Sequence, residues 1–300
     1  MKLLALKVLV AAIEEGSLRG AARQVGLSQP AMTKIVRELE VELGASMLVR
    51  TTQGVLPTAQ GKVLYEHALK VTRELGSAVD QISQLSGRMA GELSVGAVPL
   101  AVMLLIPETL RTFGGEFPDI RLKISEELYI AQLQRLRRGE VDVAIGGIPA
   151  GLVSGEFAAE PLMTTSMVVV ARKGGQFAKA TSLKQLLNAK WVYTGSKADS
   201  GYAKALFESH GMPAPPVGAL VNSTLALLSI VSTGETLALM PRQIAVHPLA
   251  APFISVVPVI EGGLDLTVGA IIRSDSAVSP AIRHFIAHLH RAAHQTSLHG

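Results

Sequence analysis

The sequence contains no cysteine and few aromatic residues. The absence of cysteine excludes disulfide bonds, cysteine-ligated metal sites and thiol catalysis, and it agrees with a reducing compartment such as the cytoplasm. Aromatic residues make up only 4% of the 300 residues, whereas 48% are hydrophobic, so the cores must consist of Leu, Val, Ile and Ala. A chain of this length is expected to form two or three domains.

Long hydrophobic runs are also missing. The longest apolar stretches, such as residues 98–107, fall short of the roughly 20 residues that a membrane span needs. The start of the chain has Lys2 and an apolar run, as a secretion signal does, but Lys7 interrupts the run and Glu14 follows it. This pattern favours an amphipathic first helix, and we expect a cytoplasmic protein with no membrane partner.

Signatures of catalysis are lacking as well. The sequence has no GxSxG nucleophile elbow, phosphate-binding loop, HExxH motif or dinucleotide fingerprint. Near the C-terminus, the pairs His284/His288 and His290/His294 are each spaced four residues apart, so that each pair could hold a metal ion from one helix face. No carboxylate is interleaved to complete such a site, and we expect no catalytic residue, no metal and no cofactor other than a small-molecule effector.

Basic residues are in slight excess. Lys and Arg number 28 against 24 Asp and Glu, which gives a formal net charge of +4. Residues 1–57 carry seven of the basic and five of the acidic side chains, so the excess is mildly concentrated there. This balance permits nucleic-acid binding but does not require it.

Two capped helices follow one another near the N-terminus. Ser17 is the predicted N-cap of a helix over 18–25, and Gly26 supplies the left-handed residue that ends it. Ser28 is the predicted cap of a second helix, which has Pro30 in its first turn. Its expected apolar stripe consists of Ala31, Ile35, Leu39 and Leu43. Such a pair is typical of a helix-turn-helix, whose second helix enters the major groove of DNA.

The outward face of the second helix carries polar side chains suited to DNA. They are Gln29, Thr33, Lys34 and Arg37. Amide and hydroxyl groups can bond to base edges, and the two cations can pair with phosphates. The same side chains could merely solvate a helix of a small bundle, and the spacing alone leaves both interpretations open.

Residues 17–61 resemble the DNA-binding region of the LysR-type transcriptional regulators. The matching features are the segment GSLRGAA, the turn LSQPA, the segment LVRT, and Ile35, Leu39, Glu40, Leu43, Gly44, Thr58 and Gly61. The pair Met47-Leu48 departs from the pattern, because the family more often has an aromatic residue beside the leucine.

The resemblance implies a wing over residues 50–55, with Arg50 near the phosphate backbone or in the minor groove. The alternative for Arg50 is a surface ion pair. The candidate DNA-binding residues are therefore Ser28, Gln29, Pro30, Thr33, Lys34, Arg37, Arg50 and Thr58.

A long helix is expected after the wing, with Thr58 as its cap and no strong breaker before Gly87. Its apolar residues follow a heptad spacing: Leu64, Ala68, Val71, Leu75, Ala78, Ile82 and Leu85. The strict 3.5-residue period favours a dimerising helix over a core helix of a globular domain. The resemblance agrees, because these regulators form homodimers through such a helix, and it implies a homotetramer as the larger assembly.

From Gly91 onward, strand-like and helical segments alternate, which predicts mostly parallel sheets with helices on both faces. Two α/β lobes are expected, with crossovers near 160–165 and 264–267. This part resembles the periplasmic-binding-protein-like effector domain of the same family, as in GEFPDI and LRRGEVDVAI. Within the family, the branches that sense aromatic acids, sulfonates or sugars look most similar. The predicted organisation is a winged helix-turn-helix (1–57), a linker helix (58–90) and an effector domain (91–300), with lobe one at 91–162 and 267–300 and lobe two at 163–266.

Ligands bind at the carboxyl ends of strands in open α/β sheets. The candidate effector-binding residues follow the predicted strands and are Val98, Pro99, Leu100, Tyr129, Gly147, Ser196, Asn222, Ser223 and Thr224. Many relatives carry Ser or Thr where this chain has Pro99-Leu100, so lobe one is expected to offer an apolar surface. For each polar residue, a cap or turn role without ligand contact is the alternative.

The sequence therefore predicts a transcription regulator that is controlled by a small-molecule effector bound between the lobes. Several of the candidate loops lead into helix N-termini, which suit an organic anion. Double-stranded DNA, a second copy of the chain, the effector and RNA polymerase are the expected partners. The alternatives are a solute-binding protein with accessory N-terminal helices and, third, an enzyme.

Overall fold

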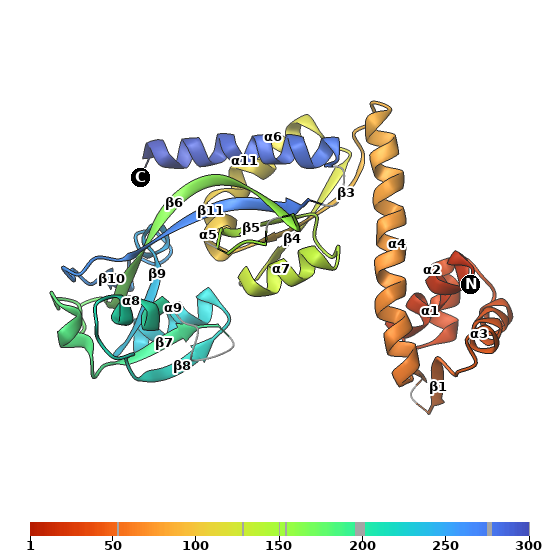
Figure 1. Cartoon of the computed structure of the whole chain (residues 1–300), viewed down its shortest axis with the longest axis horizontal. Helices are drawn as coiled ribbons and strands as arrows, with labels where there is room; N and C mark the ends of the chain where they lie inside the picture. The colour runs from red at the N-terminus through yellow and green to blue at the C-terminus, as the bar shows by residue number, and fades with distance from the viewer. Residues whose placement is uncertain are drawn as a thin grey trace. The chain divides into compact units, whose positions relative to one another are not determined.

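The computed structural model describes residues 1–52, 54–127, 129–149, 151–153, 155–195, 202–274 and 278–299, with the side chains of 129–130 and 297–299 left out. The chain forms two compact units (Figure 1). The N-terminal unit is Met1–Ser86 with Arg138–Glu140, and the C-terminal unit is Gly87–Arg137 with Val141–Gly300. Among the described residues, no helix is both long and apolar enough to cross a lipid bilayer.

The N-terminal unit consists of helices and one two-stranded sheet. Its elements are α1 (Leu3–Glu14), α2 (Leu18–Val25), α3 (Gln29–Leu43), β1 (Leu48–Thr51), β2 (Gly54–Pro57) and α4 (Ala59–Leu85). The predicted helix over 18–25 is confirmed with both of its ends. Ser17 Oγ accepts a hydrogen bond from the backbone N–H of Gly20 at 3.0 Å, and Gly26 ends the helix with φ of 72°. The tight turn between α2 and α3 therefore follows from local capping chemistry.

The apolar stripe predicted for α3 is partly wrong. The buried residues of α3 are Met32, Val36 and Leu39, so the buried face is turned by about one residue from the predicted one. Ile35 is partly buried between two small cores, whereas Leu43 is 43% exposed. The reason is that α3 packs against both α1 and α2, and this packing, rather than helical period alone, decides which side is covered.

The β1–β2 hairpin and the start of α4 are held in place by the side chain of Glu40 in α3 and by a close approach at Gly61. Glu40 Oε1 accepts hydrogen bonds from the backbone N–H groups of Met47 at 2.8 Å and Leu48 at 3.3 Å. Gly61 lies so close to Met47 that a Cβ atom there would overlap the Met47 carbonyl oxygen. Glu40 and Gly61, which carry the family resemblance, therefore fix the position of the hairpin.

The long helix α4 is only partly covered by its own unit. Ala68 is buried and Leu64 is partly buried against a small core of the N-terminal unit. The rest of the heptad seam is exposed, with Leu75 at 45%, Ile82 at 65% and Leu85 at 73%. At ~1.5 Å per residue, the 27 residues of α4 extend about 40 Å, so a long apolar stripe stays open on this chain.

The described strands of the C-terminal unit form a nine-stranded sheet in the order β4-β3-β5-β11-β6-β9-β7-β8, with β10 beside β6. The strands are β3 (Gly91–Ala97), β4 (Ile120–Glu126), β5 (Val143–Gly147), β6 (Phe157–Arg172), β7 (Lys190–Thr194), β8 (Val217–Val221), β9 (Thr236–Pro241), β10 (Ile254–Val256) and β11 (Leu264–Arg273). The helices are α5 (Pro99–Leu104), α6 (Ile106–Glu116), α7 (Tyr129–Arg137), η1 (Leu183–Leu186), α8 (Tyr202–Ser209), α9 (Thr224–Thr233), α10 (Arg242–Ala245) and α11 (Pro280–His299).

The prediction of mostly parallel sheets needs a correction at the centre. β3, β4 and β5 are parallel, as are β7, β8 and β9, and we call these two groups lobe one and lobe two. Between them, β6 and β11 are antiparallel to each other and to their outer neighbours. The segments predicted as crossovers are thus parts of two long strands, because the chain leaves lobe one in β6 and returns in β11.

The two faces of this sheet are packed differently. On one face, α5, α6, α9, α10 and α11 cover one continuous apolar core that includes residues of both lobes. Examples are Phe113 and Ile145 of lobe one and Leu227 and Met240 of lobe two. On the other face, α7 covers a small core of lobe one, and η1 and α8 cover a separate core of lobe two. Among the described residues, hydrophobic packing therefore joins the lobes along one face, whereas the cores on the other face are separate.

Candidate nucleic-acid interface and effector site

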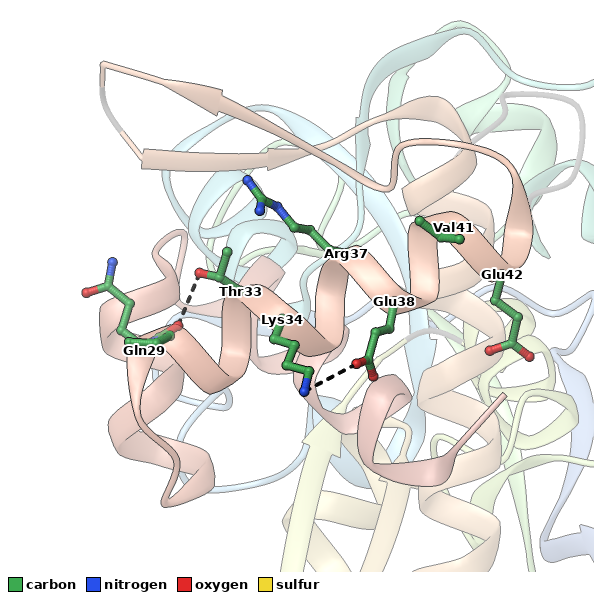
Figure 2. Close-up of a pocket in the computed structure, with 8 residues that line it drawn as sticks. Gln29, Thr33, Lys34, Arg37, Glu38, Val41 and Glu42 are labelled. Carbon is green, nitrogen blue, oxygen red and sulfur yellow. Dashed lines mark hydrogen bonds and ion pairs between the residues drawn. The ribbon is translucent and has the colours of Figure 1, made fainter.

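The outward face of α3 forms an open groove whose polar side chains reach solvent (Figure 2). The residues that line it are Gln29, Pro30, Thr33, Lys34, Arg37, Glu38, Val41 and Glu42. The four side chains that the sequence predicts for base and phosphate contacts are thus brought together on one helix face. They occupy its N-terminal half, the part of a recognition helix that approaches base edges.

Local contacts differ along this face. Thr33 Oγ1 donates a hydrogen bond to the backbone carbonyl oxygen of Gln29 at 3.1 Å, while the side-chain amide of Gln29 points outward (Figure 2). Lys34 Nζ lies 3.9 Å from Glu38 Oε1, one helical turn away. Arg37 has no hydrogen-bond or ion-pair partner among the described residues. The guanidinium of Arg37 is therefore the more available of the two cations.

The C-terminal half of the α3 face carries negative instead of positive side chains. Glu38 and Glu42 place two carboxylates there, and Val41 between them is 81% exposed. The carboxylate of Glu42 pairs with the N-terminal ammonium of Met1. Because carboxylates repel phosphates, the charge pattern favours DNA contact by the N-terminal half of α3.

The remaining candidates of the N-terminal unit have mixed roles. Ser28 is the N-cap of α3, with its Oγ accepting from Ala31 N–H at 3.3 Å, and it is exposed, as are Pro30 and Arg50. The Thr58 hydroxyl is fully used inside the unit. It donates to the carbonyl oxygen of Ser46 at 2.6 Å and accepts from the N–H of Gly61 at 2.9 Å. The predicted cap role of Thr58 is confirmed by the bond that it accepts from Gly61. Its hydroxyl hydrogen is used in the bond to Ser46.

In the C-terminal unit, strand register brings the carboxyl ends of the two lobes to face each other. Gly147 at the end of β5 lies opposite Val268, which in turn pairs with Met163 of β6. Pro241 at the end of β9 pairs with Met167 of β6 and approaches from the other direction. At about 3.3 Å per residue, the two ends are about 13 Å apart along β6. We call this region, with residues 164–166 at its floor, the inter-lobe edge.

Lobe one contributes backbone and apolar groups to the inter-lobe edge. Val98 and Pro99, at the start of α5, are half-buried, and a Cβ atom added to Gly147 would meet open space. Leu100 is only 2% exposed and belongs to the continuous core, so packing accounts for its side chain. Tyr129 begins α7, but its side chain lies outside the described residues.

Lobe two contributes the start of α9. Asn222 is exposed, Ser223 is the N-cap, and its Oγ accepts from the N–H of Ala226 at 3.4 Å. Thr224 is the first residue of the helix and is half-buried. Ser196 lies outside the described residues. Asn222, Ser223 and Thr224 follow the end of β8 and so lie on the same side of lobe two as the end of β9.

Sequence reasoning missed the polar floor of the inter-lobe edge. Thr164, Thr165 and Ser166 interrupt the apolar pattern of β6 where it passes between the lobes. Thr165 is buried and donates a hydrogen bond to Gln243 Oε1 of α10 at 2.5 Å. A crossover was expected near 160–165, and three consecutive hydroxyl residues were the available signal of a polar site there, but only the register shows that they face the ends of β5 and β9.

The histidine pairs of α11 are engaged separately. His284 packs against the Phe117 ring at 4.8 Å between centroids. His288 is buried, with Nδ1 2.8 Å from Thr112 Oγ1 and Nε2 3.2 Å from Glu116 Oε2. Burial lowers the pKa of His288, and the nearby Arg291 lowers it further. In the part of the chain that the structure describes, no three His, Asp or Glu side chains are placed to share a metal ion.

Comparison with known protein families accounts for most of the chain. Residues 3–62 match the family described as bacterial regulatory helix-turn-helix protein, lysR family. Residues 86–294 match the family described as LysR substrate binding domain. The transcriptional regulator TdcA of Escherichia coli K12 is 28% identical over 231 residues, which are 76% of this chain and 73% of TdcA. The regulator GalR of Pseudomonas putida KT2440 is 28% identical over 282 residues, which are 92% of this chain and 70% of GalR.

The fold is also that of solved full-length structures. The LysR family regulator CbnR in complex with its target DNA superposes with a TM-score of 0.72 at 22% sequence identity. The match covers 97% of this chain and 100% of CbnR. Both compact units therefore have counterparts within one known protein.

Proposed function

Since this chain belongs to the LysR family of bacterial regulatory helix-turn-helix proteins, we propose that it acts as a homodimer that binds an operator through α3 and the β1–β2 hairpin. A small molecule held at the inter-lobe edge controls this binding. The observation that carries the proposal is the open α3 face, where an exposed amide, a hydroxyl and two cations lie together on one capped helix. Family membership favours this function over a solute-binding protein or an enzyme.

The proposed DNA contacts divide by chemistry. Gln29 reads a base edge, because an amide can both donate to and accept from adenine. Lys34, Arg37 and Arg50 approach phosphates, which fixes the position of the helix. Ser28 and Thr33 add hydroxyl groups next to Gln29, and Pro30 shapes the first turn. Thr58 acts indirectly, by holding the hairpin through its contacts with Ser46 and Gly61.

Dimerisation is supported by the exposed seam of α4. A second copy would cover Val71, Leu75, Ile82 and Leu85 and would place two copies of α3 on two half-sites. Linking two binding heads raises the overall affinity without any new contact. We propose that dimers pair further into a tetramer. A regulator of this kind acts on the chromosome in the cytoplasm, and RNA polymerase is the further proposed partner.

The proposed effector is a small organic anion. The start of α9 supports this choice, because the free N–H groups and the dipole of a helix N-terminus favour negative charge. Asn222, Ser223 and Thr224 would supply polar contacts, with Gly147 leaving open space on the opposite lobe. Val98 and Pro99 would line the apolar side. A ligand shifts the regulator only as far as its affinities for two arrangements differ.

Two measurements test the proposal. For DNA, Gln29→Ala should relax sequence preference at a cost of about 1–3 kcal/mol, while Lys34→Ala should weaken all duplexes and reduce the salt slope by about one. Binding isotherms at several salt concentrations measure both effects. If both variants bind specific DNA and random DNA with the affinities of the parent, the assignment of α3 as the recognition helix is rejected.

For the effector, a library of carboxylic acids and their uncharged analogues is screened by thermal shift against the whole chain. A ligand at 100 times its Kd adds about 2.7 kcal/mol to the free energy of unfolding. The double variant Asn222→Leu, Ser223→Ala should weaken the binding of any hit by at least about tenfold. Unchanged affinity would remove the inter-lobe edge from the proposal and leave the DNA contacts standing.

A further inference from the structure

A carboxylate lies directly beside the candidate phosphate contacts of α3. Glu38 follows Lys34 by one turn, and its Oε1 lies 3.9 Å from Lys34 Nζ. The side chains of Lys34 and Glu38 are 78% and 59% exposed, and Figure 2 shows the ion pair on the groove side of the helix. An exposed pair at this spacing contributes little to folding, so stability does not explain the position of Glu38.

The two cations of the α3 face, Lys34 and Arg37, differ in whether they have an ion-pair partner. Arg37 is without a hydrogen-bond or ion-pair partner among the described residues, whereas Lys34 is held by Glu38. An ion pair must be broken, or at least lengthened, before Lys34 can approach a phosphate. The carboxylate also repels every phosphate near it, whatever the base sequence.

We propose that Glu38 is a specificity-determining residue that withholds Lys34 from random DNA. The inference rests on the proposed function. When α3 is fully seated in an operator, close charge-assisted contacts replace the ion pair with Glu38. On random DNA the helix is not seated, the phosphates stay more distant, and the ion pair persists. Glu38 therefore weakens non-specific binding more than operator binding.

The test compares Glu38→Gln with the parent on two duplexes. One is a random-sequence duplex, and the other is selected by the parent from a randomised pool. Glu38→Gln should bind the random duplex about twofold more tightly at 50 mM salt, as the loss of an exposed pair at this spacing allows, with a salt slope steeper by up to about one unit per protomer. Binding to the selected duplex should change less, so the ratio of the two affinities should fall.

A double-mutant cycle separates this mechanism from simple charge repulsion. In a Lys34→Met background, Glu38→Gln should lose most of its effect on random DNA, because Lys34 is no longer there to release. Glu42→Gln is the matched control, since it removes the same charge one turn further on, from a carboxylate that pairs with Met1. Glu42→Gln should raise the affinity for random DNA by less than Glu38→Gln does. This smaller gain should be the same in the parent and in the Lys34→Met background.

Each outcome decides the inference. An unchanged affinity of Glu38→Gln for random DNA overturns it, and so does an equal gain in the Lys34→Met background. A parallel gain on both duplexes, with the ratio unchanged, also overturns it. A parent that binds no duplex at all rejects the proposed function and this inference together, whereas failure of Glu38→Gln alone leaves the proposed function intact.

Discussion

In the N-terminal unit, the candidate DNA contacts lie on one helix and the hairpin that follows it, within residues 28–58. In the C-terminal unit, the candidate effector contacts come from separate loops spread over residues 98–224, and only strand register brings them to the inter-lobe edge. The first site is built from local signals such as caps and helical period. The second depends on pairings between segments about a hundred residues apart, which no local pattern encodes.

The DNA-binding site of the N-terminal unit is itself expected to depend on a distant partner, a second copy of the chain. The double variant Leu75→Asp, Ile82→Asp places charges into the exposed seam of α4, which a second copy would bury. We expect the dimer to dissociate and the affinity for DNA to fall by about 100-fold or more, because avidity is lost. Sedimentation measures the assembly, and duplex titration measures the affinity.

Arg73→Asp provides the control for that experiment. Arg73 is an exposed residue of α4 outside the heptad seam, so the variant carries a similar charge change without touching the stripe. It should remain dimeric. A double variant that also stays folded and dimeric would mean that the seam packs elsewhere.

The close approach of Gly61 to Met47 should make the N-terminal unit sensitive to one added methyl group. Gly61→Ala adds a methyl group that overlaps the Met47 carbonyl oxygen, and overpacking of this kind costs about 1–3 kcal/mol. Thermal unfolding should show a loss of this size in the N-terminal unit. Gly76→Ala is the matched control in the same helix, because its methyl group meets open space and should stabilise α4 by about 0.5–1 kcal/mol. Equal effects of the two variants would contradict the close approach at Gly61.

A third prediction addresses the long-range site. Gly147→Leu fills open space at the inter-lobe edge, so the free energy of unfolding should change little while effector affinity drops by about tenfold, or about 1.4 kcal/mol. Gly269→Ala is the contrasting variant, because its methyl group meets Ile148 and the Glu160 carbonyl oxygen and should destabilise the fold. Calorimetry with a hit from the ligand screen gives the affinity. Unaltered binding to the Gly147→Leu variant would place the ligand elsewhere.

The smallest expected effect concerns pH and distinguishes the buried histidine from an exposed one. The pKa of His288 is lowered in the folded state, mainly by burial, so the unfolded chain binds more protons as the pH falls. The free energy of unfolding should therefore decrease as the pH is lowered through about 6.5, with a slope of at most about 1.4 kcal/mol per pH unit from this group.

Chemical denaturation at pH 5 to 8 measures that slope, and His288→Gln should reduce it. His290→Gln alters an exposed histidine on the same helix, which lies 3.2 Å from Glu160, and it should leave the contribution of His288 in place. A slope that stays the same in His288→Gln would assign the pH dependence to other groups.

The elements that could be predicted from sequence are those defined by neighbouring residues. Ser17 and Gly26 bound α2 as expected, and Thr58 caps α4 as expected. Leu43 was wrongly assigned to the buried stripe of α3. Helical periodicity alone does not show which side of α3 is covered, because α1 and α2 decide this by packing against it. A strand ending before Asn222 was expected and is β8, but its residues Val217–Val221 lie at the sheet edge and lack the strong alternation that would define its start.

The two candidate sites also differ in how far neighbouring residues in the sequence could predict them. The polar face of α3 could be listed residue by residue, because helical geometry fixes which side chains share a face. A crossover between the lobes could be expected near 160–165, but the place of Thr164 to Ser166 at the floor of the inter-lobe edge could not, because it depends on the pairing of β6 with β9 and β11. Leu100 was expected at a surface but lies in the continuous core, where the packing of α5 places it.

The pairing of β6 with β11 has a consequence for synthesis on the ribosome. β6 ends at Arg172 and β11 begins at Leu264, so about ninety residues must be translated before the central ladder can close. At about 5–20 residues per second, β6 waits for several seconds or longer, because β9, β10 and β11 all follow it in the chain, and an exposed strand edge can pair with another chain. The order of translation therefore leaves the edges of β5 and β6 that pair with β11 open until β11 is made, and slower translation of lobe two would lengthen that exposure.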